Sequence, residues 1–100
     1  MSGDGSELRR RWRDLVERRL PEAARDRPGW PVSLDHCFAR ILLDGSCGRP
    51  WREVVRPPAW RNMPDRDLAT AIRLGEDVLA GRADLAVLNE ASLRMRGKLR

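Results

Sequence analysis

Three polar side chains of the types used in acid–base and anion chemistry recur every four residues in one helical segment. They are His36, Arg40 and Asp44, and His36 is the only histidine of the chain. A helix places them on one face, where Arg40 is expected to pair with Asp44 and to approach His36. A neutral imidazole beside an arginine and a carboxylate binds or orients an anion, or acts as a general base. Two other interpretations stay open: a buried polar network that ties this helix to residues 49–63, and a solvated face.

A second group of candidate residues lies in the segment that follows. Between positions 49 and 62, basic side chains alternate with two indoles, as in Trp51–Arg52 and Trp60–Arg61, and two consecutive prolines stiffen the chain. Such a mixture grips phosphates and stacks planar rings. The alternative is that the two indoles fill a small core and direct their N–H groups to carbonyls. The candidate ligand-binding residues are therefore His36, Arg40, Asp44, Trp51, Arg52, Trp60 and Arg61.

The sequence carries no signature of other site chemistry. Cys37 and Cys47, with a single histidine nearby, match no zinc spacing, and Cys37 falls on an apolar stripe typical of a core. There is no glycine-rich phosphate loop, no Gly-x-Ser-x-Gly turn and no dinucleotide fingerprint. We therefore predict no metal ion and no cofactor. His36 is the only candidate catalytic residue, and we favour a non-enzymatic protein while leaving enzyme activity open.

The positive charge of the chain is large but unevenly placed. The net charge is +5, and all basic residues except Lys98 are arginines, a bias that a GC-rich genome produces whatever the function. Residues 49–61 carry four arginines against one acid, whereas residues 64–90 carry six acids against three arginines. The last ten residues hold four basic side chains and no acid. A basic loop, an acidic helix and a basic tail do not form one continuous basic stripe, so nucleic-acid binding is the less favoured interpretation.

Apolar residues at helical spacing predict the elements that position these side chains. The expected helices run from a cap at Ser6 to Leu20, from a cap at Ser33 to a stop supplied by Gly45 and Gly48, from Pro64 to Gly81, and from Leu85 to Gly97. Short helical turns are expected at 51–55 and 59–63, and no alternating strand pattern occurs. The predicted fold class is all-α, a compact bundle of about four main helices with short helical turns in the connections.

We expect one helical domain over residues 7–97, between a flexible N-terminus at 1–6 and a basic tail at 98–100. The opening residues do not resemble a signal peptide, and no apolar run approaches the length of a membrane span. With two cysteines and no disulfide framework, the sequence predicts a cytoplasmic protein with reduced thiols.

The run from Leu34 to Asp44, followed by Gly48-Arg49-Pro50-Trp51 and Pro58-Ala59-Trp60, resembles a family of short uncharacterised bacterial proteins. The similarity extends from Trp12 to about Gly97. Members often carry the label of GNAT-type N-acetyltransferases. The resemblance implies a coherent fold over this range, and it assigns no catalytic residue.

Three functions follow from these residues. The favoured hypothesis is a helical module that binds a protein partner or a small anionic ligand at the candidate residues. The second is a small enzyme of acyltransferase type, with His36 as base and Arg40 as anchor for an anion. The third is nucleic-acid binding through the basic loop and tail. The sequence leaves the identity of the ligand and the oligomeric state open.

Overall fold

The computed structural model describes residues 4–98, and these residues form helices and no strand. The longer helices are α1 (Asp4–Asp14), α3 (Asp35–Cys47), α5 (Asp65–Leu79) and α6 (Leu85–Met95). The shorter elements are the π-helical turn η1 (Leu15–Arg19), α2 (Leu20–Arg25), the 3₁₀ turn η2 (Trp51–Glu53) and α4 (Ala59–Asn62). The predicted all-α bundle is confirmed. Helix α1 begins two residues before the expected Ser6 cap, and residues 1–3, 99 and 100 lie outside the described part of the chain.

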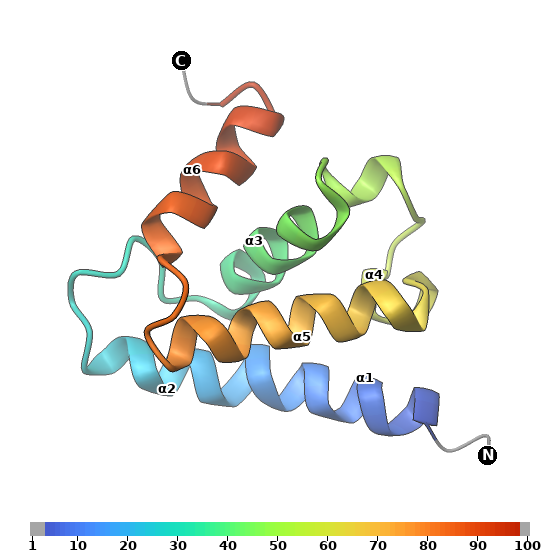
Figure 1. Ribbon diagram of the computed structural model, residues 1–100, viewed down its shortest axis with the longest axis horizontal. Coiled ribbons are helices and arrows are strands. Elements are labelled where there is room, and N and C mark those ends of the chain that lie inside the picture. The colour runs from blue at the N-terminus through green and yellow to red at the C-terminus, as the bar shows by residue number, and fades with distance from the viewer. Residues whose placement is uncertain (1–3, 99–100) are drawn as a thin grey trace.

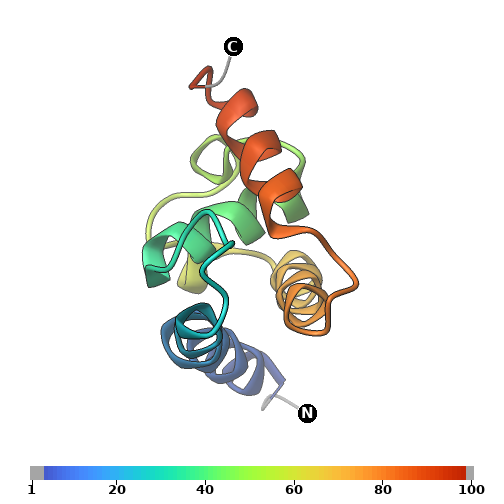
Figure 2. The same cartoon turned by 90° about the vertical axis from the view of Figure 1, so that its left-hand side faces the viewer.

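Helix α3 occupies the middle of the fold. The segments α1, η1 and α2 follow one another without a break, and this long helix lies alongside α5 with both N-termini at the same end of the molecule (Figure 1). Helix α3 packs against α5 and η1 on one side and against α6 on the other, so that α6 is separated from α1 by α3 (Figure 2). The loop with η2 and α4 joins α3 to α5. Helix α3 therefore contacts η1, α2, η2, α5 and α6.

A widened turn lets the first helix continue through Pro21. Proline has no backbone N–H, and its ring clashes with the carbonyl four residues earlier in a regular α-helix. In the structure the chain opens into a π-helical turn over Leu15–Arg19, where the Leu20 N–H donates to the Leu15 carbonyl. The sequence predicts an end or a kink near Leu20 and a short second helical piece from Glu22 to Arg27. The structure shows this second piece as α2, which follows η1 without a break and ends at Arg25.

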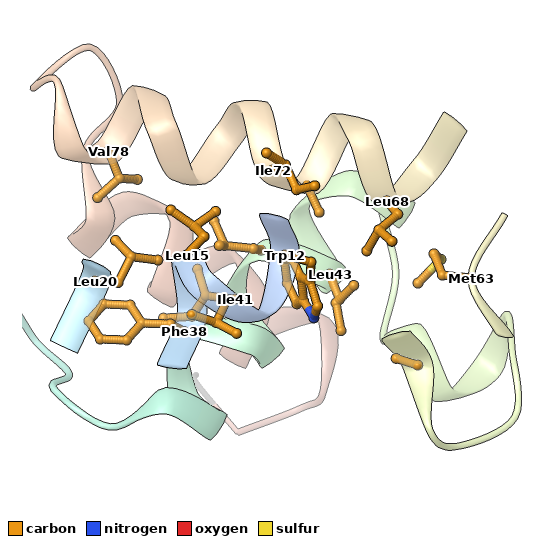
Figure 3. Close-up of a cluster of buried hydrophobic side chains, with 14 of the residues drawn as sticks. Trp12, Leu15, Leu20, Phe38, Ile41, Leu43, Met63, Leu68, Ile72 and Val78 are labelled. Carbon is orange, nitrogen blue, oxygen red and sulfur yellow. The ribbon is translucent and has the colours of Figure 1, made fainter. Parts of the chain in front are cut away.

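The core lies between the long N-terminal helix, α3 and α5 (Figure 3). Its buried apolar side chains are Trp12, Leu15, Val16, Leu20, Phe38, Ile41, Leu42, Leu43, Ala59, Met63, Leu68, Ala71, Ile72, Val78 and Leu85. Trp30 folds back on this core as expected and packs edge-on against Phe38, with 5.8 Å between ring centroids. Burial of each leucine-sized side chain contributes about 1.5–3 kcal/mol, and this term holds the domain together.

The apolar stripes of the second and last expected helices predict that Leu34 and Met95 are buried, but both side chains lie outside the core. Leu34 is 56% exposed because α3 begins only at Asp35, and the extended backbone of Leu34 takes its side chain off the helical stripe. Met95 is the last residue of α6 and is also exposed. Of the two predicted stops of α3, Gly48 ends the helix in the left-handed conformation, with a φ of 73°, and Gly45 lies inside it.

Gly75 allows α5 to approach its neighbours closely, and we predict that Gly75→Ala destabilises the fold. An added Cβ would lie 2.6 Å from Leu15 Cδ2 and 2.9 Å from Leu42 Cδ1, and both leucines are fully buried. Overpacking of this kind costs about 1–3 kcal/mol, which exceeds the gain of about 0.5–1 kcal/mol from replacing a helical glycine by alanine. Urea denaturation should therefore show a net loss of unfolding free energy.

Gly45→Ala is the matched control. Gly45 also lies within a helix, but an added Cβ meets only the end of the half-buried Leu74 side chain, which can move aside. We expect this variant to equal or exceed the wild type in stability. Equal stability of the two alanine variants would contradict the close packing at Gly75.

Candidate ligand-binding pocket

Asp44 is a fully buried charged side chain at the junction of three segments. Its carboxylate accepts hydrogen bonds from the Ser92 hydroxyl at 2.6 Å, from Arg96 Nε at 2.6 Å and Nη2 at 2.9 Å, and from the Trp51 backbone N–H at 2.9 Å. These bonds tie α3 to η2 and to the C-terminal half of α6. The hydrogen bond with Asp44 raises the pKa of Arg96 above its usual value, so the guanidinium keeps its charge.

Arg40 does not pair with Asp44, and this part of the sequence-based prediction is wrong. Its Nη1 donates to the Ser92 hydroxyl at 2.7 Å, and its Nη2 donates to Asn89 Oδ1 at 2.8 Å. The physical reason is that Arg96 competes with Arg40 for Asp44. Arg96 forms a bidentate ion pair with the Asp44 carboxylate, and the Ser92 hydroxyl lies between Asp44 and Arg40. In the described part of the chain, Arg40 has no carboxylate within ion-pair distance.

A pocket of about 570 Å³ opens between α1, α3, η2, α4 and the C-terminal end of α6, and Arg40 forms part of its wall. The lining residues are Trp12, His36, Ala39, Arg40, Leu43, Trp51, Arg52, Pro57, Pro58, Ala59, Trp60 and Arg96. Trp12, Leu43 and Ala59 are buried, so they form its floor. We call this cavity the Trp–Arg pocket. It is lined by indoles, aliphatic side chains, arginines and one histidine, and by no carboxylate-bearing residue.

Most of the candidate residues converge on this pocket. His36, Arg40, Trp51, Arg52 and Trp60 line it, although they come from α3, η2 and α4. Asp44 is absent from the lining because it is buried behind the wall, where it holds Arg96. Arg61 is also absent, and it stacks instead over the Trp60 ring at 5.3 Å.

His36 lies at the exposed rim. Its side chain is 75% exposed, and its Nδ1 is 3.6 Å from the Asp35 carboxylate. The sequence predicts that Arg40, one turn further along α3, approaches His36. The two residues line the same pocket, and no hydrogen bond between their side chains is found. The imidazole is therefore open to solvent and to any molecule that enters the pocket.

The two indoles of the basic loop differ in burial. Trp51 is half-buried, with Arg52 stacked over its ring at 5.3 Å, and its backbone N–H holds Asp44. Trp60 is 37% exposed, so the interpretation of this residue as a core side chain is wrong. The short helix α4 explains the difference, because it buries Ala59 and directs the neighbouring Trp60 outward.

Sequence reasoning missed seven residues of the pocket lining, among them Trp12 and Arg96. Trp12 was assigned to the core stripe of the first helix, which is correct but incomplete, since it also forms the pocket floor. Arg96 was assigned to a basic tail. One signal in the sequence points to the role of Arg96. No acidic residue lies within one helical turn of it, so its ion-pair partner must come from another segment.

Comparison of the chain with known protein families, with curated proteins and with solved structures finds no match. Within residues 4–98, no three His, Cys, Asp or Glu side chains are grouped so that they could hold a metal ion. None of the helices described is long and apolar enough to cross a membrane. The Trp–Arg pocket is therefore the feature of this protein that bears on its function.

We predict strong energetic coupling between Asp44 and Arg96. Asp44→Asn leaves the Arg96 guanidinium without its counter-charge, and Arg96→Met leaves the buried Asp44 carboxylate without its ion pair. Each should lower the unfolding free energy by about 3 kcal/mol. The double variant should cost less than the sum of the two by about 1 kcal/mol or more, because neither charge is then left alone.

Arg94→Met is the control for this cycle. Arg94 lies on the same helix, is exposed and has no ion pair among the described residues, so the change should stay within about 0.5 kcal/mol of the wild type. Additive costs of the Asp44 and Arg96 variants in chemical denaturation would contradict the coupling.

Proposed function

We propose that this protein is a non-enzymatic helical module that binds an anionic ligand with a planar, apolar body in the Trp–Arg pocket. The observation that carries the proposal is the state of Arg40. It is a half-buried guanidinium on the pocket wall, and its hydrogen bonds go to the neutral side chains of Ser92 and Asn89.

The charge balance around Arg40 favours an anion. Asp44 is the carboxylate of this region, and it is saturated by Arg96, Ser92 and the Trp51 N–H. A carboxylate, sulfonate or phosphate in the pocket would supply the missing counter-charge. The planar fork of a guanidinium suits such groups, and two of its N–H directions are already fixed by α6, so little side-chain entropy is lost on binding.

The apolar part of the lining favours a flat ligand body. Trp12, Leu43 and Ala59 form a dry floor, and Trp51 and Trp60 add two aromatic walls. Small-molecule sites commonly combine such a hydrophobic lining with a few placed polar groups. A purely inorganic anion would use Arg40 and leave the indoles without a partner, so an organic anion is the better fit.

Acyl transfer stays a second candidate function because His36 and Arg40 line one pocket. In this version, the solvent-exposed imidazole is the base and Arg40 holds an acidic group of the donor. The residues described contain no strand, so the sheet on which a GNAT-type enzyme builds its site has no counterpart in them. An NMR titration in which acetyl-coenzyme A shifts no signal near His36 would contradict this candidate.

We also propose that the protein is cytoplasmic, because its two cysteines, Cys37 and Cys47, are free thiols.

The binding proposal predicts that 8-anilinonaphthalene-1-sulfonate, a planar aromatic anion, occupies the Trp–Arg pocket. Titration should shift the indole N–H signals of Trp12, Trp51 and Trp60 in ¹H–¹⁵N spectra and leave that of Trp30 unchanged. Arg40→Gln should weaken binding about ten-fold or more, because a charge-assisted hydrogen bond is lost.

Arg73→Gln is the matched control, since it removes the same charge from an exposed position on α5 outside the pocket. Thermal melts identify any variant that has lost its fold. Arg52→Gln gives an independent check, because Arg52 lines the pocket and does not contact α6 through any hydrogen bond of the network. Unchanged affinity in both folded pocket variants would show that the pocket is not the anion site.

A further inference from the structure

A second hollow adjoins the Trp–Arg pocket on the other side of Trp60. It has a volume of about 680 Å³ and is lined by Trp60 and by residues of α1 and η1, which are Ser6, Arg9, Arg10, Arg13, Asp14, Glu17 and Arg18. We call it the α1 hollow. Trp60 lines both cavities, so its exposed indole forms the ridge between them. The two cavities therefore meet at this aromatic side chain.

The cations on this surface fall into two kinds. In the α1 hollow, Arg10 pairs with Glu7, Arg13 with Glu17 at 3.5 Å, and Arg18 with Asp14 at 2.7 Å. These pairs are solvent-exposed and each contributes little, so their arginines can exchange partners at small cost.

The basic loop holds the second kind. Arg49, Arg52, Arg56 and Arg61 form no ion pair with any residue in the described range. Arg52 and Arg61 instead stack on Trp51 and Trp60 at 5.3 Å. Unpaired positive charge thus lines the Trp–Arg pocket at Arg52 and continues along the basic loop, and one small anion at Arg40 neutralises only a part of it.

We propose that the anionic ligand of the Trp–Arg pocket is a segment of single-stranded nucleic acid that passes over Trp60 into the α1 hollow. This inference rests on the proposed function and names its ligand class. Bases supply the planar bodies that stack on Trp51 and Trp60, and the phosphates lie against Arg40, Arg52 and Arg61. Indole faces interleaved with guanidinium groups in a concave, basic surface are the arrangement by which proteins bind single strands without reading their sequence.

The same features disfavour the other polyanions. In a duplex, the bases are stacked on one another and cannot lie on the exposed Trp60 ring. An acidic peptide satisfies the arginines but has no flat group for the indoles at each step. A single strand uses both the charge of the basic loop and the aromatic ridge.

Binding of a fluorescently labelled oligothymidylate of eight nucleotides, followed by anisotropy with the whole chain, tests the inference. With about three phosphates neutralised, the logarithm of the binding constant should fall with the logarithm of salt concentration with a slope of about −2, which is a roughly 16-fold loss between about 50 and 200 mM. Trp60→Ala should weaken binding about ten-fold, and Trp60→Phe should retain most of it. Arg52→Gln should reduce the slope by about 0.7, whereas the control Arg73→Gln should leave it unchanged.

Four outcomes would overturn the inference. If thymidine monophosphate binds as tightly as the octamer, the pocket binds a small anion and not a nucleic-acid strand. Equal affinity for an eight-base-pair duplex would remove the role of the aromatic ridge. Tighter binding of an octaglutamate peptide would assign the surface to an acidic protein partner. If the naphthalene sulfonate binds at Arg40 and the octamer does not bind, the single-strand inference is contradicted and the proposed function stands. If neither ligand binds there, both the inference and the proposed function are contradicted.

Discussion

The buried carboxylate of Asp44 constrains everything around the pocket. Removing a charge from water costs several kcal/mol unless partners replace the lost hydration. Here the partners come from η2 and from positions 92 and 96 of α6, which lie 48 and 52 residues away along the chain. Helix α6 is thus fixed to α3 by a polar network as well as by apolar contact, and the start of the basic loop is fixed by a backbone N–H.

This network also determines which arginine is left for a ligand. Asp44 neutralises Arg96, which is mostly buried, and the Ser92 hydroxyl donates to Asp44 while it accepts from Arg40. Arg40 is therefore positioned through a neutral intermediary and keeps its charge toward the pocket. The network contains two guanidinium groups and one carboxylate, so it carries one positive charge in excess. Loss of Ser92 or Asn89 would release the Arg40 side chain without removing its charge.

The sequence predicted the parts of this structure that depend on local spacing. Periodic apolar residues indicated the four longer helices, and the four-residue spacing correctly placed His36 and Arg40 on one side of α3. What it could not give are the contacts between distant segments. The spacing rule pairs Arg40 with Asp44, but the stronger partner, Arg96, is visible only once α6 lies against α3. The π-helical turn at Leu15–Arg19 also escaped prediction, since the sequence shows only that Pro21 must disturb the helix.

The exposed indole of Trp60 is held in place by the rigid loop around it. Asn62 Nδ2 donates to the Arg56 carbonyl at 2.8 Å, which closes the segment before α4 on itself. Ala59 and Met63, on either side of Trp60, are buried in the core. Pro57 and Pro58 fix two further φ angles. A side chain presented on such a support loses little entropy when a ring stacks against it. The domain thus leaves Trp60 exposed while its neighbours Ala59 and Met63 pack inside, and the segment that holds this indole at the surface also positions it for a ligand.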